Sequence, residues 1–84
     1  MAKYDPLEDF LKNLAASTNE ITLSFDQINN ILGTDLPYSA YHYPAWWANE
    51  VKGSHVEAHA WLNAGWKVDS VDFDRKRARL VRNN

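Results

Sequence analysis

The last ten residues of the chain carry a cluster of positive charge that is suited to binding phosphate. Arginine and lysine fill five of these positions with no acid among them: Arg75, Lys76, Arg77, Arg79 and Arg82. Clustered cations attract phosphate even on a protein whose net charge is negative. Three aspartates immediately precede the cluster: Asp69, Asp72 and Asp74. The alternative expectation is that they form ion pairs with these cations across a hairpin, which leaves fewer charges free for phosphate.

The second feature that could take part in binding is a dense aromatic run in the middle of the chain. It contains five large rings: Tyr38, Tyr41, Tyr43, Trp46 and Trp47. Flat rings stack on exposed bases or anchor a partner protein. Combined with the C-terminal cations, the run predicts a nucleic-acid site in which Tyr43 or Trp47 stacks on a base. The expected site residues are Tyr43, Trp47, Asn49, Lys52, Arg75, Lys76, Arg77 and Arg79, with Lys67 and Arg82 as further phosphate contacts.

Core formation competes with binding for these rings. A domain of this size buries only roughly 60% of its unfolded surface, and its second half holds few other large residues. We therefore expect at least two of the four tryptophans in the core: Trp46, Trp47, Trp61 and Trp66.

The sequence contains histidines, serines and glycines, but not in the spacing that metal binding, nucleophilic catalysis or phosphate binding requires. His55 and His59 are four residues apart, but Glu57 does not directly follow the first histidine as a zincin helix requires. The chain has no cysteine, and no serine lies in a Gly-x-Ser-x-Gly turn. The three glycines are isolated, so a phosphate-cradling loop is missing. The sequence predicts no metal, no cofactor and no enzymatic activity.

Length and composition are those of one small globular domain. The chain has 84 residues, 45% of them hydrophobic, and a net charge of −2. Residues 1–40 carry two lysines and six acids, whereas residues 41–84 carry seven lysines and arginines and five acids. The N-terminus lacks the apolar region of a signal peptide, and no apolar run approaches the roughly 20 residues that span a bilayer. We expect a single cytoplasmic domain over residues 1–84.

Local signals predict the elements of the first half. Asp5 as N-cap and Pro6 at the first position indicate a helix over residues 6–16, and a β-branched run predicts a strand over residues 21–23. Ser24 and Gln27 have capping-box spacing, so a second helix is expected over residues 25–32, ending at Gly33.

The second half begins with an irregular segment over residues 34–53. Within it, residues 36–40 suggest one helical turn and residues 45–48 a short extended stretch. A capping box at Ser54 opens a third helix over residues 54–64. Two strands follow, over residues 66–73 and 77–82, and the parity of their apolar residues requires a bulge near residues 69–70.

The predicted fold is α+β, with three helices and a small antiparallel sheet in the order α-β-α-loop-α-β-β. This is also the element order of a winged helix, in which residues 54–64 would be the recognition helix and the terminal hairpin the wing. A helix-turn-helix joins its helices by about three or four residues. Here some twenty residues of aromatic insertion separate Gly33 from Ser54.

Several segments together resemble a small prokaryotic and phage domain family of unknown function. The resemblance covers about residues 4–82 and is carried by the starting motif at residues 5–7, the segment 21–25, the pair Trp-Trp-Ala-Asn at residues 46–49 and Ala-Trp-Leu-Asn-Ala-Gly-Trp at residues 60–66. It implies that Trp46, Trp47, Asn49 and Trp66 form the signature cluster of the family, either as core or as site. It implies no catalytic residues.

Two functions are compatible with these observations. The first is a non-enzymatic domain that binds DNA or RNA through the basic hairpin and the aromatic loop. The second is a protein-interaction module or small inhibitor, of phage or defence-system type, that docks through the aromatic loop. The sequence leaves the partner and the oligomeric state open.

Overall fold

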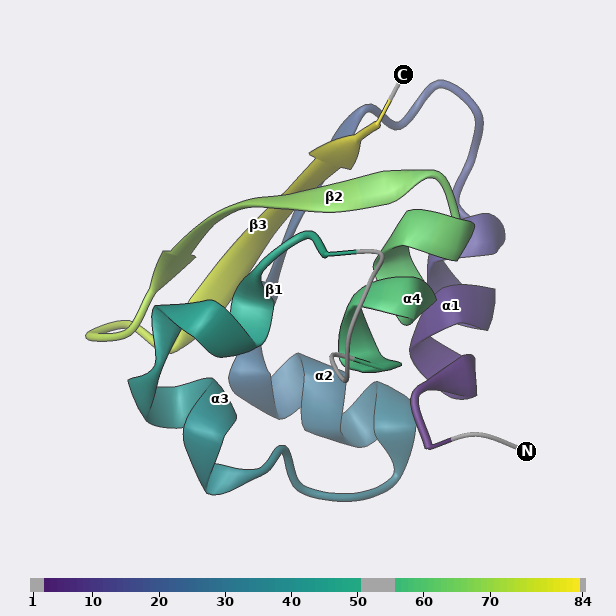
Figure 1. Ribbon diagram of the computed structural model, residues 1–84. Coiled ribbons are helices and arrows are strands. Elements are labelled where there is room, and N and C mark those ends of the chain that lie inside the picture. Colours follow the sequence, from purple (N-terminus) through teal and green to yellow (C-terminus); the bar gives the residue numbers. More distant parts are fainter. Residues whose placement is uncertain (1–2, 51–55, 84) are drawn as a thin grey trace.

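A three-stranded antiparallel sheet with helices on one side forms the architecture of the protein (Figure 1). The computed structural model describes residues 3–50 and 56–83. The α+β class expected from the sequence is confirmed. In chain order the elements are α1 (Asp5–Lys12), β1 (Glu20–Ser24), α2 (Phe25–Leu32), α3 (Tyr38–His42), the 3₁₀ helix η1 (Pro44–Trp47), α4 (Val56–Asn63), β2 (Trp66–Asp72) and β3 (Arg77–Arg82).

The strand order in the sheet is β1-β3-β2, so the C-terminal strand lies in the centre. Leu80 of β3 pairs with Ile21 on one side and with Val68 on the other. The register of β2 shifts between Val68 and Ser70, which confirms the expected bulge. The bulge keeps apolar residues on the helix-covered face on both sides of the shift.

The core lies between the sheet and helices α1, α2 and α4. Leu7 and Leu11 of α1 are buried there, as the helical spacing of the sequence predicts. The expectation that at least two tryptophans are buried is confirmed. Three of them are 3% exposed or less: Trp47, Trp61 and Trp66. Trp46 is half-buried and contacts the rings of Trp47 and Trp61.

Two local predictions were wrong. Helix α1 begins at Asp5 and ends at Lys12, and its N-cap is Tyr4 rather than the side chain of Asp5. Residues 45–48 are not extended, because Pro44 starts the 3₁₀ helix η1, for which its fixed φ is suited. The helical turn expected at residues 36–40 is found as α3, two residues later.

The capping box of α2 is present as expected. Ser24 Oγ accepts a hydrogen bond from the Gln27 N–H at 3.0 Å, and Gln27 Oε1 accepts one from the Ser24 N–H at 2.8 Å. The corresponding prediction for Ser54 lies outside the described residues. Within the described part of the chain, every helix is too short or too polar to cross a membrane.

Candidate nucleic-acid interface

The turn between β2 and β3 presents three exposed cations, Arg75, Lys76 and Arg77, which we call the basic turn. The Arg75 N–H donates to Asp72 Oδ1 at 3.0 Å, which closes the turn. The carbonyl of Lys76 accepts from the N–H of Phe25 at 2.8 Å, which fixes the turn to the start of α2. The backbone that carries the three cations is therefore fixed, and the side chain of Arg77 has no ion-pair or hydrogen-bond partner among the described residues.

Lys76 adopts a backbone conformation that is unusual for its residue type. Its φ is 53°, in the left-handed region that favours glycine. A lysine at this position places a cation at the tip of the hairpin at some conformational cost. Unfavourable backbone geometry of this kind is more frequent at functional sites than elsewhere.

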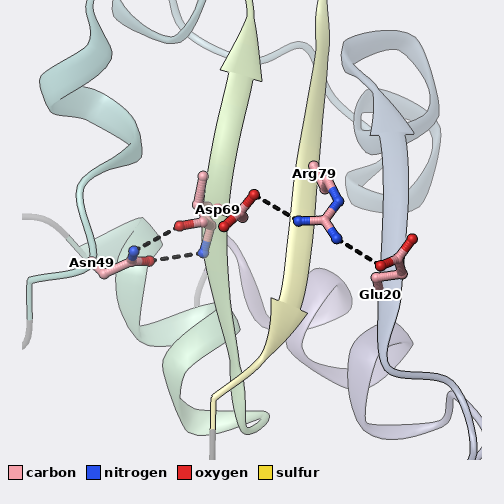
Figure 2. Close-up of polar contacts among 5 residues, drawn as sticks. Glu20, Asn49, Asp69 and Arg79 are labelled. Carbon is pink, nitrogen blue, oxygen red and sulfur yellow. Dashed lines mark hydrogen bonds and ion pairs between the residues drawn. The ribbon is translucent and has the colours of Figure 1, made fainter.

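Arg79 is held by two carboxylates on the neighbouring strands. Its guanidinium contacts Glu20 of β1 and Asp69 of β2, each at 2.6 Å (Figure 2). The hydrogen bonds to Glu20 and Asp69 raise the pKa of Arg79 above its usual range. Arg79 thus lies between two carboxylates in a row across the sheet, and it is not a free phosphate contact.

Arg82 is also engaged within the fold. Its Nε donates to the carbonyl of Thr18 at 2.9 Å and one terminal nitrogen donates to the carbonyl of Ala15 at 3.0 Å. The guanidinium lies over the ring of Trp66, 4.5 Å from the centroid. These contacts join the end of β3 to the loop between α1 and β1, so Arg82 has a structural role.

Trp47 lies in the core and not on a binding surface. Its side chain is 3% exposed, and its ring is stacked between those of Phe25 at 5.2 Å and Trp61 at 6.0 Å. The indole N–H donates to the carbonyl of Ala40 at 2.8 Å. Both faces of the ring are covered, so the expected stacking of Trp47 on a base is replaced by stacking inside the protein.

Asn49 acts as a structural connector. Its side-chain oxygen accepts from the indole N–H of Trp61 at 2.9 Å. The same oxygen accepts from the Val68 N–H at 2.9 Å, and the amide donates to the Val68 carbonyl at 2.8 Å (Figure 2). These bonds use both the oxygen and the amide nitrogen of the Asn49 side chain within the fold. Lys52, the remaining predicted contact of this segment, lies outside the described residues.

Tyr43 is exposed and belongs to an aromatic surface cluster. Tyr38 is 69% exposed and Tyr43 54% exposed, and their ring centroids are 6.3 Å apart. The imidazole of His42 stacks on Tyr38 at 4.1 Å. We call Tyr38, His42 and Tyr43 the aromatic cluster. Of these three, only Tyr43 was among the expected site residues, although Tyr38 belongs to the aromatic run of the sequence and the i, i+4 spacing of Tyr38 and His42 on a short helix was a usable signal.

The basic turn and the aromatic cluster lie at the same end of the molecule (Figure 1). Phe25 connects them, because its ring contacts Tyr41 of α3 at 5.2 Å and Phe73 of the turn at 6.4 Å. Lys67 lies at the other end of the hairpin, near the start of β2 and paired with Val81. Of the predicted set, Tyr43 and the three cations of the turn are exposed, and they lie on segments that Phe25 joins through Tyr41 and Phe73.

A shallow hollow opens on the solvent side of the sheet beside the basic turn. It has a volume of about 350 Å³, and Arg77 lines one side of it. The other lining residues are polar and come from all three strands: Thr22, Ser70, Asp72 and Arg79. This surface has hydrogen-bond donors for a phosphate group next to the turn, together with one carboxylate.

Helix α4 does not present a basic recognition surface. Glu57, Ala58, Ala60 and Trp61 are buried against the rest of the domain, and residues 56–63 contain no lysine or arginine. The winged-helix analogy therefore extends to the order of elements, and in the described part of residues 41–84 the exposed cations belong to the hairpin. Of the predicted histidine pair, His59 lies in α4 and His55 lies outside the described residues. In the part of the chain that is described, no group of three metal-ligating side chains gathers.

Comparison with known proteins places this arrangement in a family. No curated protein and no solved structure matches the chain. One family matches residues 4–83, and it is described as a domain of unknown function, DUF7662. The match covers nearly the whole chain, including the aromatic cluster, Asn49 and the basic turn, and it agrees with the resemblance found in the sequence. The chain therefore belongs to the DUF7662 family.

Proposed function

We propose that this protein is a non-enzymatic, cytoplasmic domain that binds single-stranded DNA or RNA with the end formed by the basic turn and the aromatic cluster. The observation that supports the proposal is that three cations whose side chains have no ion pair with another described residue lie at the same end of the domain as three exposed aromatic rings. Cations that follow a phosphate backbone, combined with rings that stack on bases, are the general means of binding single strands.

The two parts of the site have different roles. Arg75, Lys76 and Arg77 neutralise phosphates, and with three contacts on a single strand the logarithm of the binding constant should fall with the logarithm of salt with a slope of about −2. Tyr38 and Tyr43 stack on unpaired bases, each contributing about 1–3 kcal/mol. A duplex has no unpaired bases, so it engages the cations alone and binds more weakly.

The position of Lys76 allows a sharp test of the phosphate contacts. In Lys76→Gly the turn keeps its left-handed residue and loses one cation, so folding is preserved or improved while binding weakens. The matched control is Lys67→Ala, which removes an exposed cation from the other end of the hairpin. Binding is measured by the fluorescence anisotropy of a labelled single-stranded oligonucleotide at about 50 and 200 mM salt.

The expected result is a salt slope that is shallower by about 0.7 for Lys76→Gly and unchanged for Lys67→Ala. Tyr43→Ala weakens single-strand binding and leaves the slope unchanged, because stacking releases no counterions. Equal effects of Lys76→Gly and Lys67→Ala would contradict the proposal, as would the absence of any salt-sensitive binding.

A second candidate function is docking of a partner protein on the aromatic cluster. It is favoured by the high exposure of Tyr38 and Tyr43, since exposed tyrosines are frequent anchors of protein interfaces. In that case Tyr43→Ala abolishes association, at a cost of more than about 2 kcal/mol if the residue is a hot spot. Lys76→Gly then has little effect, which separates the two functions.

A further inference from the structure

The two edge strands of the sheet differ in how their outward main-chain groups are used. At β2 the side chain of Asn49 donates to the carbonyl of Val68 and accepts from its N–H (Figure 2). It thereby occupies the place of a neighbouring strand. At β1, no residue in 3–50 or 56–83 hydrogen-bonds the main chain of Thr22.

The phase of the β1–β3 ladder shows which groups of β1 face outward. The Arg82 N–H donates to the carbonyl of Asn19, just before the first pair of this ladder, and the Phe25 N–H donates to the carbonyl of Lys76, just after the last pair. Asn19 and Phe25 therefore both occupy bonded positions. Antiparallel pairs alternate between bonded and non-bonded positions, so Ile21 and Leu23 bond to β3. The N–H and C=O groups of Glu20 and Thr22 therefore point away from the sheet.

We propose that this edge pairs with the same edge of a second copy of the chain. The two β1 strands run antiparallel about a two-fold axis at Thr22, which places Thr22 opposite Thr22 and Glu20 opposite Ser24 of the other copy. The Ser24 N–H stays bonded to Gln27 Oε1 of its own copy, so the main-chain bonds between the copies centre on the two Thr22 residues. The result is one continuous six-stranded antiparallel sheet. Isologous pairing of this kind uses the same groups on both copies and is a common route to dimers.

Charge complementarity supports this register. Ser24 has Arg77 as its neighbour on β3, and Arg77 has no partner within the described part of one copy. In the dimer, Glu20 of the other copy lies opposite Ser24 on the same solvent-facing row, two strand spacings, or about 10 Å, from Arg77. The side chain between them is a short hydroxyl, so the long Arg77 and Glu20 side chains can meet above it. Oε2 of each Glu20 binds Arg79 of its own copy, so Oε1 is the oxygen that faces Arg77 of the other copy.

The like charges nearest the axis do not oppose this pairing. Arg79 pairs with Thr22 across β1 and β3, so the two Arg79 residues of a dimer are three strand spacings apart, about 14 Å. Each is already neutralised by Glu20 and Asp69. Two five-residue strands bury less than the roughly 1,200 Å² of a stable interface, so the dimer is a weak one that depends on concentration.

The experiment is sedimentation equilibrium of the whole chain without nucleic acid, from about 10 µM to about 1 mM, the range of weak association. The wild type is expected to change from monomer to dimer over this range. Thr22→Pro removes the central outward N–H and retains the β1–β3 ladder, because proline is tolerated where an edge N–H faces solvent. This variant should remain monomeric with an unchanged circular dichroism spectrum.

Charge reversal then tests the register. Arg77→Glu should weaken dimerisation at least about twofold at low salt, and Lys67→Glu, a matched reversal on the strand at the far edge, should not. A wild type that stays monomeric at 1 mM overturns the inference. So does a dimer that persists in folded Thr22→Pro, or one equally affected by the two reversals. Because no nucleic acid is present, these results are independent of the proposed function.

Discussion

Replacing Asn49 by alanine should destabilise the fold strongly, although Asn49 is on the surface. The substitution removes three hydrogen bonds of 2.8–2.9 Å. The indole N–H of Trp61 is then left without a partner at 0% exposure, which costs about 1–3 kcal/mol. The two Val68 groups lie at a sheet edge, where water replaces part of the loss, so they add about 1 kcal/mol.

The expected total is about 2–4 kcal/mol, which for a domain of this size lowers Tm by roughly 10–25 °C. Urea unfolding followed by tryptophan fluorescence measures the free energy, and Asn30→Ala is the control because Asn30 is an exposed asparagine of α2. In a double-mutant cycle with Trp61→Phe, which removes the indole N–H, Asn49→Ala should cost about 1–3 kcal/mol less. A loss below about 1 kcal/mol, or equal losses in both backgrounds, would refute the reasoning.

Other substitutions test the packing and the charges. Trp47→Ala should cost about 3–5 kcal/mol in urea unfolding, because it empties a core position; a near-neutral result would place the ring outside the core. Arg82→Ala should cost about 1–3 kcal/mol, whereas Arg75→Ala should change stability by less than about 0.5 kcal/mol, and equal losses would contradict the assigned roles. Burial, and secondarily the charge of Glu57, raises the pKa of Tyr4 above 10. The folded state thus favours the neutral phenol, and its stability falls as pH rises past about 10. In thermal melts at about pH 9 and pH 11, Tyr4→Phe should lose less stability than the wild type, and an equal loss would count against burial of the phenol.

Elements whose signals are local were predictable from the sequence. Helix α2 begins at Ser24 and ends before Gly33 because the capping box and the left-handed glycine each act within four residues. The bulge of β2 followed from the parity of Val68 and Val71, since both must face the helices. These features depend on neighbouring residues, which a single sequence contains.

The composition of the candidate site depended on contacts between distant residues. Trp46 and Trp47 are adjacent and chemically identical, and only the positions of Phe25 and Trp61 determine which ring is enclosed. In the same way, Arg79 contacts Glu20, which is 59 residues away in the chain. The sequence showed that these cations were clustered and could not show which of them were already neutralised.

The most direct test of the proposed function is a titration of isotope-labelled protein with a single-stranded oligonucleotide of about 12 nucleotides, followed by amide chemical shifts. The account predicts that the shifts which change in a salt-dependent manner belong to residues 38–43 and 75–77. Residues 5–12 of the acidic helix α1 should not change. Changes spread evenly over the chain, or confined to α4, would contradict the central claim that the basic turn and the aromatic cluster form the binding surface.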